Sequence, residues 1–184
     1  MRRETVTTHQ AFSIIELMVV VAILSLLMGL LLPALAKARE SARSANCLAN
    51  LKQITNGFHL LADDNDGRLP DLDDDQPWDL RVQSYLDTDA HVFVCPSDDL
   101  AAEDLAAGFA GLSYSWREWF EVGDASASLS GRRLDEVKAT DLILVFENLA
   151  DRHRDWHLNA ATVDASARAY SLDEFEDNLA RPVR

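Results

Sequence analysis

The sequence has none of the short motifs that usually mark an enzyme. It contains no nucleophile elbow, phosphate-binding loop or zinc-hydrolase motif, so no residue stands out as catalytic. Basic residues are also scarce, because 17 Lys and Arg stand against 31 Asp and Glu and give a net charge of −14. So acidic a surface argues against nucleic acid as a partner and suits a soluble exterior or cation binding. We therefore expect neither an enzyme nor a nucleic-acid-binding protein.

Cysteine is nearly absent, and the two that are present, Cys47 and Cys95, leave two interpretations open. An even number suits a disulfide if the chain folds outside the cytoplasm. The alternative is two small buried thiols. A bridge requires the Cα atoms to come within about 7 Å of each other, which the sequence does not show. We predict that the two cysteines lie close together and form a disulfide in an oxidising compartment.

Charge is missing altogether from residues 17 to 36, which are twenty consecutive uncharged residues. A helix rises 1.5 Å per residue, so about 20 such residues cross a bilayer core of about 30 Å. This run therefore predicts a membrane-spanning helix. Glu16 lies at its edge between Ile15 and Leu17. A carboxylate at mid-bilayer costs roughly 2.5–3.5 kcal/mol, so Glu16 needs a function and a partner.

The residues around this run resemble a known signal. A short leader with Arg2 and Arg3, then Ala11, Phe12 and Glu16, is similar to the prepilin-type N-terminal cleavage and methylation signal of type IV pilins and type II secretion pseudopilins. The resemblance implies that a prepilin peptidase cuts between Ala11 and Phe12 and methylates the new amine. The family usually has Gly where this chain has Ala11.

Cleavage before Phe12 would give Glu16 a partner. The new ammonium lies four residues from Glu16, or meets Glu16 of a neighbouring subunit, and opposite charges attract strongly in a low dielectric. Glu16 is thus the candidate assembly residue. Pro33 also resembles the family, in which such a proline bends the long helix, and a proline inside a helix removes one hydrogen bond.

Two other interpretations of the N-terminal run stay open. Ala34 and Ala36, followed by Lys37, match the A-x-A site of an ordinary secretory signal peptide. Cleavage after Ala36 would release a secreted binding domain, whereas an uncleaved run would be a plain single-pass anchor. An ordinary signal has an apolar region of about 7–15 residues, shorter than the run here, and neither interpretation explains Glu16.

Beyond Pro33 the pattern predicts that the helix continues to about residue 62. Apolar residues recur with spacings of 4, 3, 4 and 3, which is one face of a helix: Cys47, Leu51, Ile54, Phe58 and Leu61. The expected divisions of the chain are a leader over 1–11, a transmembrane and filament-core helix over 12–36, its amphipathic continuation over 37–62, and a globular head over 63–184.

A second resemblance covers the end of this helix. The segment is similar to pseudopilin-like proteins abundant in planctomycetes and verrucomicrobia, and the matching residues are Cys47, Asn50, Leu51, Lys52, Gln53, Asp64, Asp66, Gly67 and Pro70. Asp, Asn and Gly end a helix, and proline prevents its resumption. Residues 63–75 contain seven Asp, which form either a solvated loop or a calcium site that includes Asp64 and Asp66.

Short apolar runs in the head indicate strands of an antiparallel sheet. They are residues 91–95, closed by Pro96, then 142–146 and 158–163. The C-terminal residues 173–184 favour a short helix or tail. The predicted fold class is α+β, with a long N-terminal helix packed on a small head that contains an antiparallel sheet.

Two histidines in the head have no settled role. His153 and His157 are four residues apart, a spacing that binds zinc on a helix, but His157 begins a run that favours a strand. The pseudopilin-like group closes with a His and then an Asp-Gly hairpin turn. In this chain the corresponding pair is Asp164 and Ala165, so the turn lacks the expected glycine.

The resemblance implies a structural subunit of a type IV pilus-like or type II secretion filament. Its partners would be a prepilin peptidase, the inner membrane, and other subunits that contact its N-terminal helix. It would be a single-pass protein with a cytoplasmic N-terminus and a periplasmic head. This orientation follows from the resemblance, because the basic residues on the two sides of the run do not favour it.

Overall fold

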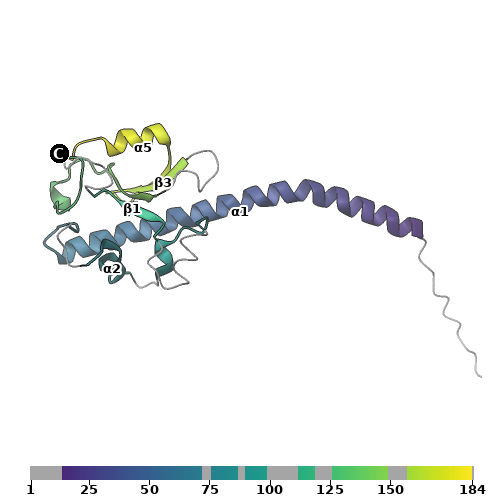
Figure 1. Cartoon of the computed structure of the whole chain (residues 1–184), viewed down its shortest axis with the longest axis horizontal. Helices are drawn as coiled ribbons and strands as arrows, with labels where there is room; N and C mark the ends of the chain where they lie inside the picture. The colour runs from purple at the N-terminus through teal and green to yellow at the C-terminus, as the bar shows by residue number, and fades with distance from the viewer. Residues whose placement is uncertain are drawn as a thin grey trace, which may run out of the picture. The chain divides into compact units, whose positions relative to one another are not determined.

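The structure is a computed structural model, and it describes residues 14–71, 76–86, 90–98, 112–118, 126–148 and 157–183. The chain divides into two compact units, residues 1–39 and 40–184, which are considered separately below. Helix α1, Ile14–Asp64, contributes to both (Figure 1). The predicted helix over 12–62 is therefore confirmed for the residues that the structure describes.

In the first unit, α1 is apolar on every side. It is the one helix in the described ranges that is long and apolar enough to cross a membrane, with a mean hydropathy of 2.8 over its most apolar window. Pro33 lies inside it and has no N–H to donate to the carbonyl of Gly29. Ser25 Oγ donates a hydrogen bond to the Val21 carbonyl at 2.8 Å, so this hydroxyl is satisfied within the helix. The bend at Pro33 stays a prediction.

In the second unit, α1 buries the predicted stripe. Cys47, Leu51, Ile54 and Phe58 have no exposed surface, and Leu61 is also buried. The helix ends as its sequence predicts. The amide of Gly67 donates to the Ala62 carbonyl at 2.7 Å, and both Asp66 and Gly67 have positive φ, at 52° and 78°. This left-handed turn satisfies a terminal helix carbonyl.

The sheet has four antiparallel strands in sequential order. They are β1 (Tyr114–Trp116), β2 (Ile143–Glu147), β3 (His157–Thr162) and β4 (Ala167–Ser171). Strands β2 and β3 confirm two of the predicted apolar runs. The pairing of β2 with β3 shifts register between Ile143 and Val145. The fold is thus α+β and pilin-like, a long N-terminal helix packed against a small head with a four-stranded antiparallel sheet.

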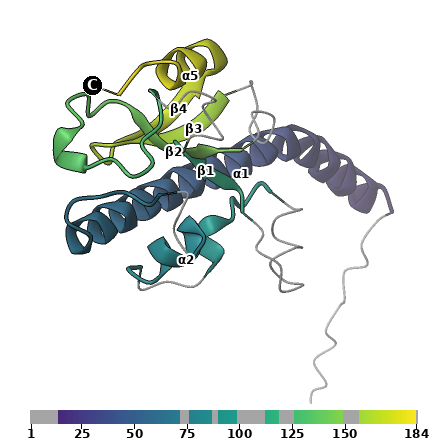
Figure 2. The same cartoon turned by 60° about the vertical axis from the view of Figure 1, so that its left-hand side comes forward.

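Each face of the sheet buries its own apolar cluster. One face packs on α1 with side chains such as Leu144 and Trp116, and the ring of Trp116 lies 5.2 Å from that of Phe58. The other face packs on helix α5, Leu172–Leu179, where the rings of Phe146 and Phe175 are 5.1 Å apart. Figure 2 shows the sheet between the two helices.

Two helical elements close the far side of α1. Helix α2 spans Trp78–Gln83, and the 3₁₀ helix η1 spans Ala90–Phe93. Gly57 allows α2 to approach, because a Cβ on Gly57 would come within 2.6 Å of Val82 Cγ1. A second 3₁₀ helix, η2 (Leu134–Glu136), follows the loop that pairs with the end of α1.

The prediction of a strand at residues 91–95 is wrong. This segment is η1 followed by a turn, in which the Val94 amide donates to the His91 carbonyl at 3.1 Å. Val92 to Cys95 are all buried, so the apolar run correctly indicated core residues. A short apolar run does not distinguish a strand from a helical turn, and here the local hydrogen bonds form the latter.

The β3–β4 hairpin forms without the expected glycine. Ala165 adopts a φ of +62°, in the left-handed region that L-residues rarely occupy. The Asp164 carboxylate supports the turn by accepting hydrogen bonds from Thr162 Oγ1 at 2.5 Å and from the Ser166 amide at 3.0 Å. These bonds lower the pKa of Asp164, with the Thr162 hydroxyl as the largest cause.

Replacing Ala165 by glycine is expected to stabilise the head. The left-handed conformation costs an L-residue roughly 1–2 kcal/mol, and glycine avoids that cost while losing part of the gain to chain entropy. We expect Ala165→Gly to raise the free energy of unfolding by about 0.5–1 kcal/mol in denaturant titrations. Ala169→Gly is the matched control, because Ala169 is exposed in β4 and glycine there should cost about 0.5–1 kcal/mol. If both substitutions changed the free energy of unfolding in the same direction, the result would contradict this account.

Candidate functional site

The N-terminal end of α1 carries the first candidate site. Glu16 lies in the first turn of the helix, where unsatisfied backbone amides and the helix dipole favour a negative charge. Ala11 and Phe12 lie outside the described residues. The structure therefore places the predicted assembly residue at the start of the helix, and leaves the cleavage position and the Phe12–Glu16 pair as predictions.

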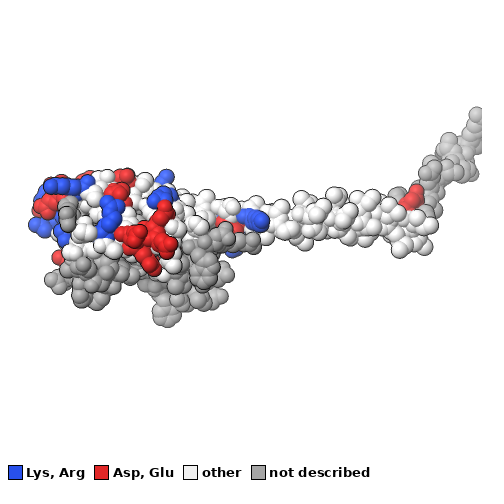
Figure 3. Space-filling model, turned by 90° about the horizontal axis from the view of Figure 1, so that it is seen from above, with Lys and Arg blue, Asp and Glu red and all other residues white. Residues whose placement is uncertain are grey.

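The first unit exposes an unusually large apolar surface. The large apolar side chains from Ile14 to Leu35 are all at least 47% exposed, and Figure 3 shows this stretch of α1 as an almost unbroken uncharged surface. A soluble protein rarely exposes so much contiguous apolar area. Lipid or the apolar surface of another chain would cover it.

The two cysteines form the second candidate site. Cys47 on α1 and Cys95, two residues after η1, are joined in a disulfide with their Cα atoms 5.3 Å apart. The bridge connects Cys47, the first residue of the buried stripe of α1, to the segment that follows η1. Of the two interpretations that the sequence leaves open, the structure has the bonded one.

The disulfide predicts a simple labelling result. Alkylation of the denatured, unreduced protein should modify neither Cys47 nor Cys95, and reduction before alkylation should expose both to the reagent. Intact mass spectrometry separates the two products. Two alkylated cysteines in the unreduced sample would show that the mature protein keeps buried thiols instead.

A buried carboxylate lies beside the disulfide, and the sequence analysis missed it. Glu147, the last residue of β2, is 1% exposed, and its Oε1 lies 3.5 Å from Cys95 Sγ. A sulfur in a disulfide carries no proton, so this is a contact and not a hydrogen bond. The backbone amide of Asn159 on β3 donates a hydrogen bond to Glu147 Oε2 at 2.9 Å. An acidic residue after an apolar run usually indicates the exposed end of a strand. The sequence around Glu147 therefore gave no indication that this residue is buried.

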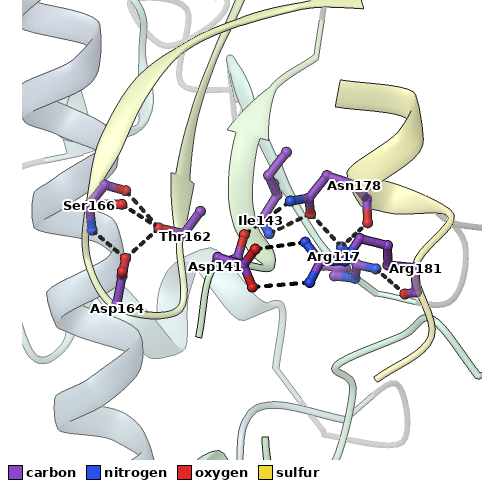
Figure 4. A network of polar contacts seen from close by, with 8 residues as sticks. All are labelled: Arg117, Asp141, Ile143, Thr162, Asp164, Ser166, Asn178 and Arg181. Atoms are coloured by element: carbon purple, nitrogen blue, oxygen red, sulfur yellow. Dashed lines mark hydrogen bonds and ion pairs between the residues drawn. The ribbon is translucent and has the colours of Figure 1, made fainter. Parts of the chain in front are cut away.

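A second polar network, also missed, joins β1 to the end of α5 (Figure 4). The guanidinium of Arg117 is buried and donates to five oxygens, those of Ala127, Asn178 (main chain and side chain), Leu179 and Arg181, at 2.6–3.1 Å. Two of these carbonyls, those of Asn178 and Leu179, belong to the last turn of α5, which has no further helical amides to bond them. Burial and, to a smaller extent, the neighbouring Arg181 together lower the pKa of Arg117 to about 10, so the group stays charged at neutral pH.

Asn178 and Arg181 extend this network to the start of β2. Asn178 Oδ1 accepts from the Ile143 amide at 2.9 Å, and its Nδ2 donates to the Asp141 carbonyl at 3.0 Å. Arg181 forms a two-pronged ion pair with the Asp141 carboxylate, which holds the pKa of Asp141 below its usual range. These contacts tie the end of α5 to the segment that leads into β2.

The Asp-rich turn places its two candidate calcium ligands beside different partners. Asp64 ends α1, and its carboxylate adds to the rise in the pKa of Tyr85 that burial mainly causes. Asp66 is close enough to Arg133 to contribute to the raised pKa of that guanidinium, after Asp135 and Glu136. Both carboxylates thus already interact with neighbouring side chains.

Calcium binding by this turn stays a prediction. If Asp64 and Asp66 bind Ca²⁺, the melting temperature should rise with millimolar calcium by mass action, and a double Asp64→Asn, Asp66→Asn variant should lose that rise. A double Asp173→Asn, Asp177→Asn variant on α5 controls for the general loss of acidic charge. A melting temperature that does not change with calcium leaves the solvated loop as the interpretation.

The histidine pair is only partly described. His157 is the exposed first residue of β3, whereas His153 lies outside the described residues. His157 therefore lies on a strand, so the helical spacing that would place both imidazoles on one face does not apply to it.

Comparison with known proteins bears on the first of these sites. Residues 7–32 match the family model of the prokaryotic N-terminal methylation motif, a range that includes Ala11, Phe12 and Glu16. No curated protein and no solved structure matches the chain. The grouping with planctomycete-like pseudopilins stays a prediction. The chain carries the prokaryotic N-terminal methylation motif and is pilin-like both in that motif and in its fold.

Proposed function

We propose that this protein is a structural subunit of a type IV pilus-like or type II secretion filament, and not an enzyme. The observation that carries the proposal is the methylation motif over residues 7–32, which leads directly into a helix whose apolar side chains are exposed on all sides. A helix that is apolar all round belongs in a membrane or in the core of a larger assembly. One segment serves both environments in a subunit that waits in the membrane before it joins a filament.

In this proposal a prepilin peptidase cuts between Ala11 and Phe12 and methylates the amine of Phe12. The N-terminus faces the cytoplasm, residues 12–36 span the inner membrane, and the amphipathic continuation over 37–62 lies in the periplasm together with the head over 63–184. The disulfide is consistent with this placement, because disulfides persist in the oxidising periplasm. Other subunits contact the N-terminal part of α1, and nucleic acid is not a partner.

The N-terminus of the mature protein distinguishes the proposal from its main alternative. Mass spectrometry of the protein purified from membranes should find a chain that starts at N-methylated Phe12. A chain that starts at Lys37 would instead show cleavage by ordinary signal peptidase after Ala36 and release of a secreted binding domain. Ala11→Leu is the matched variant, because a bulky residue before the cut should leave the full-length chain in the membrane.

A further inference from the structure

The carboxylate beside the disulfide completes a set of three potential metal ligands. Cys47, Cys95 and Glu147 are 0%, 0% and 1% exposed. One ligand atom from each residue lies within 4.8 Å of the ligand atoms of the other two. A disulfide has no need of a carboxylate, and an apolar side chain would pack against it at lower cost.

The carboxylate is held in the way that proteins hold a metal ligand. Glu147 Oε2 accepts a hydrogen bond from the Asn159 backbone amide at 2.9 Å, and Oε1 accepts one from the side-chain Nδ2 of Asn159 at 3.3 Å. Asn159 Nδ2 is itself 3.2 Å from Ser44 Oγ on α1. Hydrogen bonds of this kind fix the orientation of a coordinating carboxylate. They turn Oε1 toward Cys95 Sγ, 3.5 Å away.

The spacing fits tetrahedral zinc. With Zn–S of about 2.3 Å and Zn–O of about 2.0 Å, the sulfur and oxygen ligands of a tetrahedral site are about 3.5 Å apart, and two sulfur ligands are about 3.8 Å apart. The distance from Cys95 Sγ to Glu147 Oε1 is already 3.5 Å, which is the expected sulfur–oxygen spacing. The two sulfurs are bonded in the disulfide, so they must move apart after reduction, while all three ligand atoms already lie within 4.8 Å of one another.

We propose that the dithiol form of this protein binds one zinc ion through Cys47 Sγ, Cys95 Sγ and Glu147 Oε1. Reduction adds two electrons and two protons to the disulfide, and zinc then displaces both protons to leave two coordinated thiolates. Thiolates favour zinc over the hard cations calcium and magnesium. A groove of about 480 Å³ lined by Asn50, His91 and Cys95 lies beside the buried site. Water takes the fourth position.

The site and the disulfide are mutually exclusive, because the same sulfurs serve both. A newly made chain is in the dithiol form until an oxidant acts on it. Bound zinc would then hold α1 against the segment after η1, at the place that the disulfide later holds covalently. This inference does not depend on the proposed filament function.

The test uses the full-length chain in detergent. A trialkylphosphine takes the oxygen of a water molecule and leaves its two hydrogens on the sulfurs, so it reduces the disulfide without adding a competing thiol. Zinc is then titrated, and its stoichiometry is measured by elemental analysis after gel filtration. Cobalt(II) serves as a second probe, because thiolate coordination gives an intense near-ultraviolet charge-transfer band. We expect one zinc per reduced chain and none for the oxidised chain.

Three variants locate the site. Glu147→Gln keeps the shape of the side chain and should weaken zinc binding by at least about tenfold. Glu176→Gln, an exposed carboxylate on α5, should bind as the unaltered chain does. A Cys47→Ser, Cys95→Ser chain should not bind. Formation of the disulfide and the melting temperature of oxidised Glu147→Gln show whether that variant folds. No binding by the reduced chain, or equal binding by a folded Glu147→Gln, overturns the proposal.

Discussion

Glu16→Leu should abolish filament assembly while membrane insertion and leader cleavage continue. If the chain were only an anchor, this substitution would be harmless or helpful, because it removes a polar group from apolar surroundings. In a filament subunit, cleavage creates an ammonium at Phe12 that needs the Glu16 carboxylate. Removing one partner of a buried pair strands the other charge and costs roughly 3–5 kcal/mol. That is about a hundredfold or more in subunit association.

The measurement compares membrane and filament fractions by immunoblot, with cleavage read from the size of the chain. Glu16→Gln separates charge from packing, since it keeps the shape of the side chain and should fail in the same way. Ala11→Leu should show the opposite lesion, an uncut chain that remains in the membrane. Normal recovery of Glu16→Leu protein in filaments would refute the pairing argument and, with it, our physical reason for the filament role.

Arg117→Met should be among the most destabilising single substitutions in the head. Methionine fills much of the volume but donates no hydrogen bond, so the five oxygens that Arg117 contacts each lose one donor. The two oxygens of Asn178 keep the amides of Ile143 and Arg181 as donors, whereas no other donor is described for the carbonyls of Ala127, Leu179 and Arg181. A buried acceptor without a donor costs about 1–3 kcal/mol, although those nearest the surface regain water. We expect a loss of about 3–5 kcal/mol in the free energy of unfolding, measured by denaturant titration.

Arg181→Met is the matched control for this prediction. Arg181 contributes its carbonyl to the Arg117 network, which the substitution keeps, and its side chain forms a partly exposed ion pair with Asp141. Such a pair is worth about 0–1 kcal/mol. Arg117→Lys should fall between the two, because an ammonium keeps the charge but cannot reach five acceptors. A loss for Arg117→Met no larger than for Arg181→Met would mean that the network contributes little.

The parts of the molecule that could be predicted are those whose signal is local in the sequence. The long helix and its buried stripe follow from helical periodicity, and the methylation signal lies within a few residues of the apolar run. The prediction of a strand at residues 91–95 was wrong because its four consecutive apolar residues, 92–95, fit a strand and a buried helical turn equally well.

The polar networks could not be predicted, because their partners are distant in the sequence. Arg117 and Asn178 are separated by 61 positions, and nothing near Arg117 indicates that it would be buried beneath the end of a helix. Glu147 is a similar case, since its burial depends on α1 and β3 packing around it. Charged residues are mostly exposed, so the sequence favours the surface for both.

The position of the disulfide has a mechanical consequence. The covalent route for tension applied to the N-terminal end of α1 leaves the helix at Cys47 and passes through the bridge directly to Cys95. Residues 48–94, which include the rest of α1 and all of α2, then form a closed ring outside the load path. A pull on the helix therefore loads the segment that leads from Cys95 toward the sheet, and residues 48–94 cannot be drawn out into an extended chain while the bridge is intact.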